Sequence, residues 1–269
     1  QVHVGPNALR RWHQLHQIDP LASMTVLVLG GTGKTGLSLV QQLLGRGLQV
    51  RAIVRSPEKL PNDVTNHAAF NILSGKILEI SDETMQEYLV GCTAVISCLG
   101  HEGNFQGICG KASRLLVYEA LRRVCRAIVA RPIQSPPVKV VLMSTGLYTK
   151  PDSLQDVKIR NTCGQRALLF LLSTCLPPHN DNMRAAEFLR TELSNQKGIE
   201  WCGVRPELLI DGEVSQYEVN ESLVCSIFSA GQTSRSNVAH FMCELIQNSS
   251  TWQKWKGTFP LIYNASAAE

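Results

Sequence analysis

The chain has 269 residues, of which 44% are hydrophobic and 18% are charged, and its formal net charge is +4. This length suits a single large α/β domain, and the composition is that of a soluble globular protein. The basic residues are scattered, which argues against a nucleic-acid partner, and no apolar run approaches the roughly 18 residues that a membrane span needs. We therefore expect a soluble protein that binds a small-molecule substrate, as a monomer or a weak homodimer.

The first 23 residues differ in character from the rest of the chain. They hold Arg10, Arg11 and three histidines against a single acid, Asp19. This stretch could be an N-terminal extension, a trimmed terminus, or the remainder of an organellar transit peptide. We expect a cytoplasmic protein, or one from the interior of an organelle if the third alternative holds, with one folded domain over residues 24–269.

The strongest local signal is the segment 26–36, in which an apolar run leads into three glycines. Gly30, Gly33 and Gly36 follow one another at three-residue spacing, and apolar residues then recur at helical spacing. This pattern predicts a strand, a tight turn and a helix, because glycine tolerates positive φ and lets a backbone approach a ligand closely. We expect the turn to bind the pyrophosphate of a dinucleotide at the helix N-terminus, through Gly30, Thr32, Gly33, Lys34, Thr35 and Gly36.

One competing motif can be excluded. Gly33, Lys34 and Thr35 superficially match the end of the phosphate loop of nucleoside triphosphatases. That loop needs another glycine five residues before the position of Gly33, and the residue there is Val28, in the middle of the predicted strand. Binding of ATP or GTP is therefore not expected.

The residue after the second predicted strand bears on which dinucleotide binds. Arg55 lies about 20 residues after the glycine turn, where an acid would bind the adenosine ribose and an arginine would bind a 2′-phosphate. The sequence therefore favours NADP(H) over NAD(H), with Lys34, Ser56 and Lys59 as further donors. The alternative is that Arg55 and Lys59 are solvated loop charges.

Strand and helix patterns alternate along most of the chain. This alternation predicts an α/β fold, a Rossmann-like doubly wound parallel sheet with its ligand cleft at the carboxyl edge and a small C-terminal substrate lobe. The segments 100–107 and 211–231 interrupt the pattern and are candidates for ligand contact. We expect strands at 25–29, 49–54, 75–80, 93–98, 138–143 and 200–205, and helices near 34–46, 83–90, 111–131, 163–175 and 180–196.

The cysteines and the late aromatic residues are expected to be structural. The nine cysteines form no CxxC pair and no metal-ligand spacing, so we interpret most of them as reduced core thiols and expect no metal site. Trp252, Trp255, Phe259 and Tyr263 are expected in the core. The arginines at 122, 123, 126 and 131 are expected on the solvated face of a helix.

Several segments together resemble atypical short-chain dehydrogenases/reductases, and most of all the NmrA-like proteins and the biliverdin-IXβ and flavin reductase type. The resemblance runs from about Met24 to the end of the chain, and Asn237 stands where the group has Asp. The segments that carry it are the glycine turn 30–36 and residues 51–55, 94–100, 140–145, 204–209 and 235–239.

The resemblance implies a role for each cofactor-binding position. Gly30, Gly33 and Gly36 would hold the pyrophosphate and Arg55 the 2′-phosphate. Ser81 and Asp82 would lie near the adenine, Cys98, Leu99 and Gly100 would line the ribose side, and Pro206 would meet the nicotinamide. Substrate-binding elements would lie at about 145–180 and 206–235.

The catalytic positions depart from the family pattern. Tyrosine-dependent members use a Tyr-x-x-x-Lys pair, in which the phenol donates a proton and the lysine lowers its pKa. Counting back from the segment 187–190, which is similar to the one that follows this lysine in the family, places the pair at His179 and Met183. Ser144 at the end of the fifth strand is a candidate for substrate contact, and Tyr148 is a candidate substitute phenol or a loop aromatic that packs over the cleft.

Three interpretations remain open. His179 could act as a surrogate acid with Ser144 orienting the substrate, or it could merely flank the helix after two prolines. The acceptor could be a flavin or a tetrapyrrole that takes its proton from solvent. The chain could also lack turnover and act as an NADP(H) sensor or a scaffold. We expect an NADPH-dependent reductase of a small organic or conjugated cyclic substrate, with the non-catalytic regulator as the rival.

Overall fold

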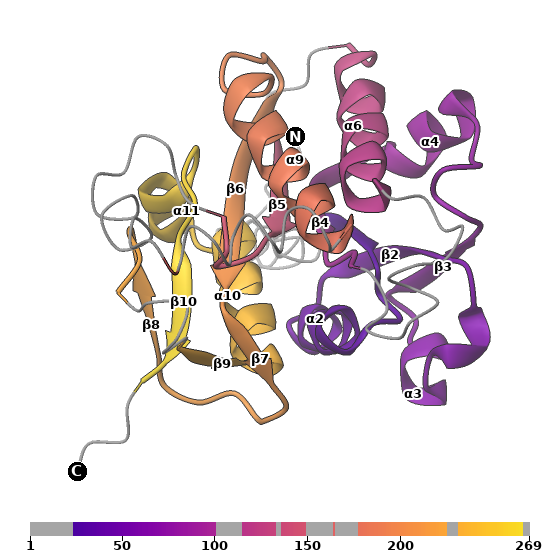
Figure 1. The fold of residues 1–269 in the computed structure, drawn as a ribbon. Helices are drawn as coiled ribbons and strands as arrows, with labels where there is room; N and C mark the ends of the chain where they lie inside the picture. Colours follow the sequence, from indigo (N-terminus) through magenta and orange to yellow (C-terminus); the bar gives the residue numbers. More distant parts are fainter. Residues whose placement is uncertain are drawn as a thin grey trace, which may run out of the picture.

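A computed structural model describes residues 24–100, 115–132, 136–148, 164, 177–224 and 231–265. The N-terminal stretch 1–23, the predicted helix at 163–175 apart from residue 164, and most of the loop 100–107 lie outside these ranges. Within them the chain forms a central sheet with helices on both faces (Figure 1).

The central sheet has eight strands in the order β3-β2-β1-β4-β5-β6-β10-β8. All neighbouring pairs are parallel except β10 and β8, which are antiparallel. β7 (Leu208–Ile210) and β9 (Gln232–Ser234) form a separate parallel pair. The strands of the central sheet are β1 (Thr25–Leu29), β2 (Gln49–Val54), β3 (Phe70–Ser74), β4 (Cys92–Ser97), β5 (Val138–Met143), β6 (Ile199–Pro206), β8 (Tyr217–Asn220) and β10 (Leu261–Asn264).

The helices divide between the two faces of the sheet. The buried side chains of α2, α10 and α11 belong to one hydrophobic core, and those of α4, α6 and α9 belong to the other. Figure 1 shows α4, α6 and α9 on one side of the sheet and α2 with α10 on the opposite side. The helices are α2 (Lys34–Gly45), η1 (Pro57–Lys59), α3 (Asn62–Thr65), α4 (Asp82–Leu89), α6 (Leu116–Val129), α9 (Pro177–Thr191), α10 (Arg235–Gln247) and α11 (Ser249–Trp255).

The two cores explain why the parallel strands are continuously apolar. In β1, Val26 and Val28 pack into the core of α2 and α10, whereas Leu27 and Leu29 pack into the core of α4, α6 and α9. Side chains alternate across a strand, so a strand covered on both faces has no polar side. The predicted doubly wound sheet is confirmed.

The predicted third strand is wrong. β3 covers Phe70–Ser74, and its Phe70 pairs with Val50 of β2, whereas the segment 75–80 that was expected as a strand forms turns. β3 is an edge strand that is only partly buried and that carries Asn71 and Ser74. Its apolar signal is therefore weaker than that of the following segment, whose Ile77, Leu78 and Ile80 pack against the core from a loop.

Several side chains take the places that were expected, and two arginines do not. Trp252, Trp255, Phe259 and Tyr263 are buried, and so are the five cysteines that the structure describes, all of them unpaired. Arg123 and Arg131 were expected in solvent. Instead, Arg123 donates to the backbone carbonyls of Leu78 and Ile80, and Arg131 donates to that of Leu89. These two arginines hold neighbouring segments against α6.

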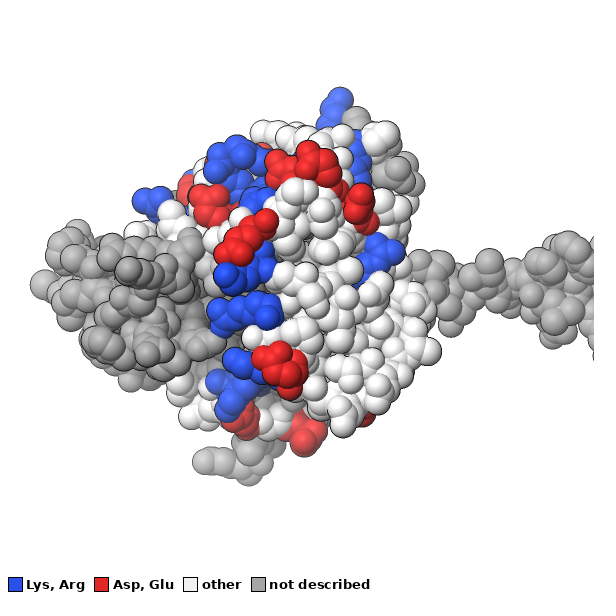
Figure 2. Space-filling view, turned by 90° about the vertical axis from the view of Figure 1, so that its right-hand side faces the viewer, with Lys and Arg blue, Asp and Glu red and all other residues white. Residues whose placement is uncertain are grey.

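The described surface carries charges of both signs. Figure 2 looks onto the side of α4 and β3, where Lys and Arg alternate with Asp and Glu in a band beside a wide stretch without charged residues. The part of this face that is described shows no large patch of a single sign. Among the helices in the described ranges, none is both long enough and apolar enough to cross a membrane.

Candidate functional site

The glycine turn lies between β1 and α2, and two of its glycines have steric reasons to be there. Gly30 has φ of +79°, and a Cβ on it would lie 2.8 Å from the backbone carbonyl of Cys98. A Cβ on Gly36 would overlap the carbonyl oxygen of Gly30. The turn closes through a hydrogen bond of 3.0 Å from the Gly33 N–H to the Gly30 oxygen. The backbone thus forms a tight cradle that side chains would fill.

The N-terminus of α2 is arranged to receive an anion. Gly33 is its N-cap, no side chain caps the helix there, and the first turn contains no acidic residue. The positive end of the helix dipole and the N–H groups of the first turn are therefore available to a phosphate.

A cavity of about 750 Å³ opens beside this turn. This volume lies within the roughly 300–1,000 Å³ that is usual for ligand sites. Its walls come from the ends of β1, β2 and β4 and from the loop after β3, all at the carboxyl edge of the sheet. The lining residues are Leu29, Gly30, Thr32, Gly33, Lys34, Ile53, Val54, Arg55, Lys59, Gly75, Lys76, Ile77, Leu78, Glu79, Cys98, Leu99, Gly100 and Leu116.

The cavity is lined by more cationic than anionic side chains. Lys34, Arg55, Lys59 and Lys76 contribute to its walls, and Glu79 is the one carboxylate among the lining residues. Lys76 and Glu79 form an exposed ion pair of 3.0 Å with each other. The remaining positive charge surrounds the N-terminus of α2 and the end of β2, so the described walls favour an anionic ligand.

Most of the cofactor-binding positions expected from the sequence line this cavity. Gly30, Thr32, Gly33, Lys34, Arg55, Cys98, Leu99 and Gly100 are all in its walls. Thr35 and Gly36 are not: Thr35 is buried, and Gly36 packs behind the turn against Gly30.

Three further positions lie outside the described walls. Ser81 is the N-cap of α4 and accepts from the N–H of Thr84, and Asp82 pairs with Arg123 at 3.3 Å. Pro206 ends β6, and its carbonyl accepts a hydrogen bond from the N–H of Gly146. Each of the three residues has a contact within the fold, and their roles in binding a cofactor stay predictions.

The sequence reasoning missed the wall formed by residues 75–79. Because the third strand was expected at 75–80, the residues that follow the actual strand were assigned to the sheet. A strand placed at Phe70–Ser74 would have put Gly75, Lys76 and Glu79 at the carboxyl edge, where ligands bind in such sheets.

Two buried hydroxyls lie at the carboxyl ends of the neighbouring strands β4 and β5. Ser97 ends β4 opposite Leu142, and Ser144 follows β5 with its N–H bonded to the carbonyl of Val204. Because side chains alternate, both fall on the face covered by α6 and α9, to which Leu142 belongs. Both hydroxyl oxygens are buried and have no hydrogen-bond partner within the described structure.

The two positions that replace the family's Tyr and Lys both lie on α9. His179 is buried with 8% of its surface exposed, and its Nδ1 has no hydrogen-bond partner in the described part of the chain. Burial lowers the pKa of the imidazole, so the ring is neutral at pH 7. Met183 is partly buried against the core of α4, α6 and α9. His179 and Ser144 lie outside the described cavity walls.

The residue between these two positions has a structural task. The carboxylate of Asp181 is fully buried and accepts hydrogen bonds from the backbone N–H groups of Val117 at 2.8 Å and Tyr118 at 2.9 Å. Asp181 thereby caps α6 from α9 and satisfies two donors of its first turn. The beginning of α9 is therefore fixed against the beginning of α6.

Tyr148 lies in the core rather than in the described cavity walls. It is 2% exposed, its ring packs against that of Phe259 at a tilt of 50° with 4.7 Å between the centroids, and its hydroxyl donates to Glu187 at 3.3 Å. Burial and the Glu187 carboxylate raise the pKa of the phenol to about 12. A phenol with this pKa and this partner fits a packing role and is poorly matched to proton donation near neutral pH.

The sheet order and the glycine turn define a Rossmann-type dinucleotide-binding domain. The model of a family described as NAD(P)H-binding matches residues 30–249. The chain belongs to this NAD(P)H-binding family, and its resemblance to short-chain dehydrogenases/reductases is confirmed at the level of the fold.

Known proteins resemble the chain to different extents. An uncharacterized chloroplastic protein of Arabidopsis thaliana is 34% identical over 80 residues, which cover 30% of this chain and 29% of that protein. A short-chain dehydrogenase/reductase of Veillonella parvula in complex with NADP has a TM-score of 0.61 at 13% identity, covering 90% of this chain and 95% of that one. An anaerobilin reductase of Escherichia coli O157:H7 has a TM-score of 0.60 at 14% identity, covering 91% and 100%. At these identities the two solved structures establish the fold alone.

Proposed function

We propose that the protein is an NADPH-dependent reductase that transfers hydride to a small organic or conjugated cyclic acceptor. The observation that carries the proposal is the cavity at the carboxyl edge, which joins a glycine cradle to a set of cationic side chains. The cradle fits a pyrophosphate, and NADPH when bound supplies the hydride.

The preference for the phosphorylated cofactor rests on Arg55. It lines the cavity at the end of β2 together with Lys59 and Lys34, and no carboxylate follows β2 directly. A guanidinium pairs with a phosphate through a charge-assisted fork, whereas the 2′-hydroxyl of NADH offers it much less. The Veillonella parvula protein, which has a similar fold, was solved in complex with NADP, and this supports a nicotinamide cofactor in the proposal.

The acceptor would meet the unpartnered groups on the α9 side of the sheet. Ser144 can donate a hydrogen bond to an acceptor oxygen, and neutral His179 can donate a second one when its proton is on Nδ1. Both side chains are buried, and a polar ligand atom would satisfy them. In this assignment Ser144 and neutral His179 orient a carbonyl substrate by hydrogen bonding, and the proton of the product hydroxyl comes from solvent, because the lowered pKa of His179 disfavours the imidazolium form that could donate it.

A conjugated cyclic acceptor would not need a proton donor from the protein. A flavin or a tetrapyrrole can accept hydride while its proton comes from solvent, so the missing Tyr and Lys would not prevent the reaction. The anaerobilin reductase among the structural neighbours is a reductase on this fold.

The test is oxidation of NADPH with a panel of carbonyl compounds, quinones and flavins. We expect turnover with at least one class. For a carbonyl substrate, Ser144→Ala and His179→Gln should each lower kcat/KM by at least about tenfold, whereas a flavin-type acceptor should leave the His179→Gln rate unchanged. Ser194→Ala is the control, because Ser194 is exposed in the turn after α9 and its hydroxyl donates to the Arg190 carbonyl.

The second candidate is a non-catalytic NADP(H)-binding regulator. It is favoured by the loss of the Tyr-Lys pair to His179 and Met183 and by the high pKa of the buried Tyr148. In this case NADPH would raise the unfolding temperature of the protein, yet no acceptor of the panel would be reduced above background. That combination of results would reject the reductase and support the regulator.

A further inference from the structure

Asp211 connects the C-terminal part of the molecule to the glycine turn. It follows β7, and its two carboxylate oxygens bind different cations: Oδ2 accepts from Lys34 Nζ at 2.7 Å, and Oδ1 accepts from Arg235 at 2.6 Å. Lys34 is the first residue of α2 and lines the cavity, and Arg235 is the first residue of α10. One exposed carboxylate therefore holds Lys34, one of the cations of the cavity wall.

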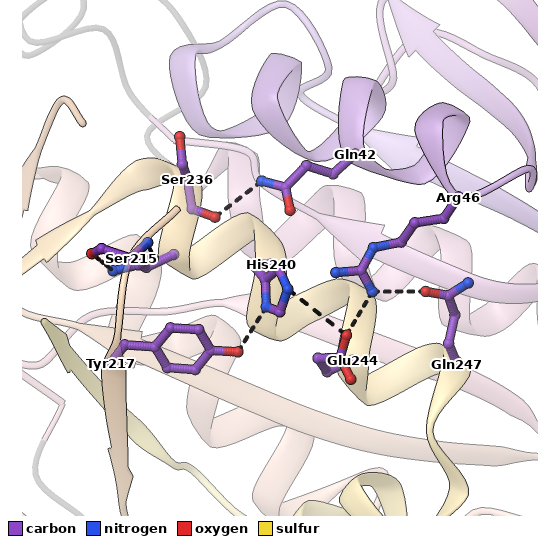
Figure 3. A network of polar contacts seen from close by, with 9 residues as sticks. Gln42, Arg46, Ser215, Tyr217, Ser236, His240, Glu244 and Gln247 are labelled. Atoms are coloured by element: carbon purple, nitrogen blue, oxygen red, sulfur yellow. Dashed lines mark hydrogen bonds and ion pairs between the residues drawn. The ribbon is translucent and has the colours of Figure 1, made fainter. Parts of the chain in front are cut away.

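The two helices that meet at Asp211 are fastened side by side. Figure 3 shows Gln42 of α2 donating to the carbonyl of Ser236 in α10, and Arg46 bonded to Glu244 and Gln247 further along. Early residues of α10 thus meet α2, and late residues of both helices meet, so the helices run in parallel. The N-termini of both helices lie at the carboxyl edge of the sheet, where their dipoles present their positive ends.

This arrangement creates competition for Lys34. A phosphate group at the N-terminus of α2 lies in the same positive field as Asp211 and would need the same ammonium group. Arg235 is the less exposed of the two cations, at 24% against 71% for Lys34, and it would keep Asp211 paired after Lys34 had left. Lys34 can therefore change partner without stranding the carboxylate.

We propose that Asp211 limits the affinity of the cavity for phosphate groups of a dinucleotide by holding Lys34. The inference rests on the proposed function, because it needs a dinucleotide in the cavity. Exposed ion pairs are weak, so release of Lys34 corresponds to an affinity gain of up to about fivefold. An increase in ligand affinity would distinguish this role from a purely structural one, since removing an Asp that only stabilises the fold would not tighten ligand binding.

The experiment is a double-mutant cycle on cofactor affinity. NADPH and NADH are titrated into the wild type, Asp211→Asn, Lys34→Met and the double variant. We expect Asp211→Asn to tighten NADPH binding about three- to fivefold and to have no such effect in the Lys34→Met background. Glu213→Gln removes the same charge two residues away, where no contact with Lys34 is formed, and should leave affinity unchanged.

Each outcome decides between the alternatives. If Asp211→Asn increases the affinity for NADPH alone, the inference is supported and the 2′-phosphate is the group that competes with Asp211 for Lys34. If the affinity for NADH increases equally, the inference is supported and the competing group is the pyrophosphate. A gain that persists without Lys34, or that Glu213→Gln reproduces, overturns it in favour of a general charge effect, and so does no gain. If the folded wild type binds neither nucleotide, the proposed function fails and this inference fails with it.

Discussion

Asn237 allows a sharp test of how the C-terminal part is held together. It is fully buried at the start of α10. Its Nδ2 donates to Ser215 Oγ at 3.0 Å and to Asn264 Oδ1 at 2.8 Å, and its Oδ1 accepts from the N–H of Ser215 at 2.8 Å. An Asp at this position, which the resemblance would imply, cannot make the two donor contacts.

The cost of Asn237→Asp follows from these contacts. The hydrogen bond to Asn264 is lost, at about 1–1.5 kcal/mol, and a carboxylate oxygen then faces Asn264 Oδ1, which adds about 1–2 kcal/mol; the Ser215 hydroxyl can rotate and donate to the carboxylate. Asn264 cannot relieve this repulsion by rotating its amide, because the same Oδ1 accepts from the N–H of Ser234. We expect the free energy of unfolding to fall by about 2–3.5 kcal/mol at pH 7. The loss should shrink as the pH falls from 7 toward about 4, because burial raises the pKa of the new carboxyl in the folded state, where it is protonated first and donates again.

Urea unfolding followed by tryptophan fluorescence measures this loss. Asn248→Asp is the matched control, because Asn248 caps α11 with its Oδ1 alone, accepting from the N–H groups of Ser250 and Thr251. Asp is an equally good cap, so the control should be neutral or slightly stabilising. A loss below about 1 kcal/mol for Asn237→Asp, or a similar loss in both variants, would refute the argument.

Three other predictions concern the turn and α9. Gly36→Ala places a Cβ on the Gly30 oxygen and should weaken NADPH binding at least about tenfold in a fluorescence titration, whereas Gly45→Ala, with open space around it, should bind normally. Asp181→Ala leaves two N–H groups of α6 without their acceptor and should cost about 2–3 kcal/mol in urea unfolding; a neutral result would reject the cap. Burial lowers the pKa of His179, so the unfolded chain binds more protons; stability should fall from pH 7 to pH 5, and less steeply in His179→Gln, whereas equal slopes would contradict this.

The strands that the sequence predicted well are those buried on both faces. β1, β2 and β5 agree with the expected bounds because their apolar runs are continuous and end at turn residues. β3 was not predicted because it is an edge strand that is only partly buried and therefore contains polar residues, while the stronger apolar pattern lies in the loop that follows it. Sequence patterns report burial, and they report strands only where the two coincide.

The parts of the site that could be predicted are those whose residues lie close together in the sequence. The glycine turn and Arg55 belong to one βαβ unit, so their spacing along the chain determines their spacing in the fold. The contacts of Asp211 with Lys34 and of Tyr148 with Glu187 join segments far apart in the sequence. No local pattern encodes such pairs, and this is why Tyr148 was a candidate acid before its burial was known.

The most direct test of the cofactor assignment is a titration of NADPH and NADH into the wild type and Arg55→Asp. We predict that the wild type prefers NADPH and that Arg55→Asp weakens NADPH binding by about 10- to 100-fold, the worth of a charge-assisted hydrogen bond, while NADH affinity changes little. Arg55→Lys should retain part of the preference. If both cofactors weaken alike in Arg55→Asp, or if the wild type binds NADH as tightly as NADPH, Arg55 does not bind a 2′-phosphate and the assignment of the cofactor is wrong.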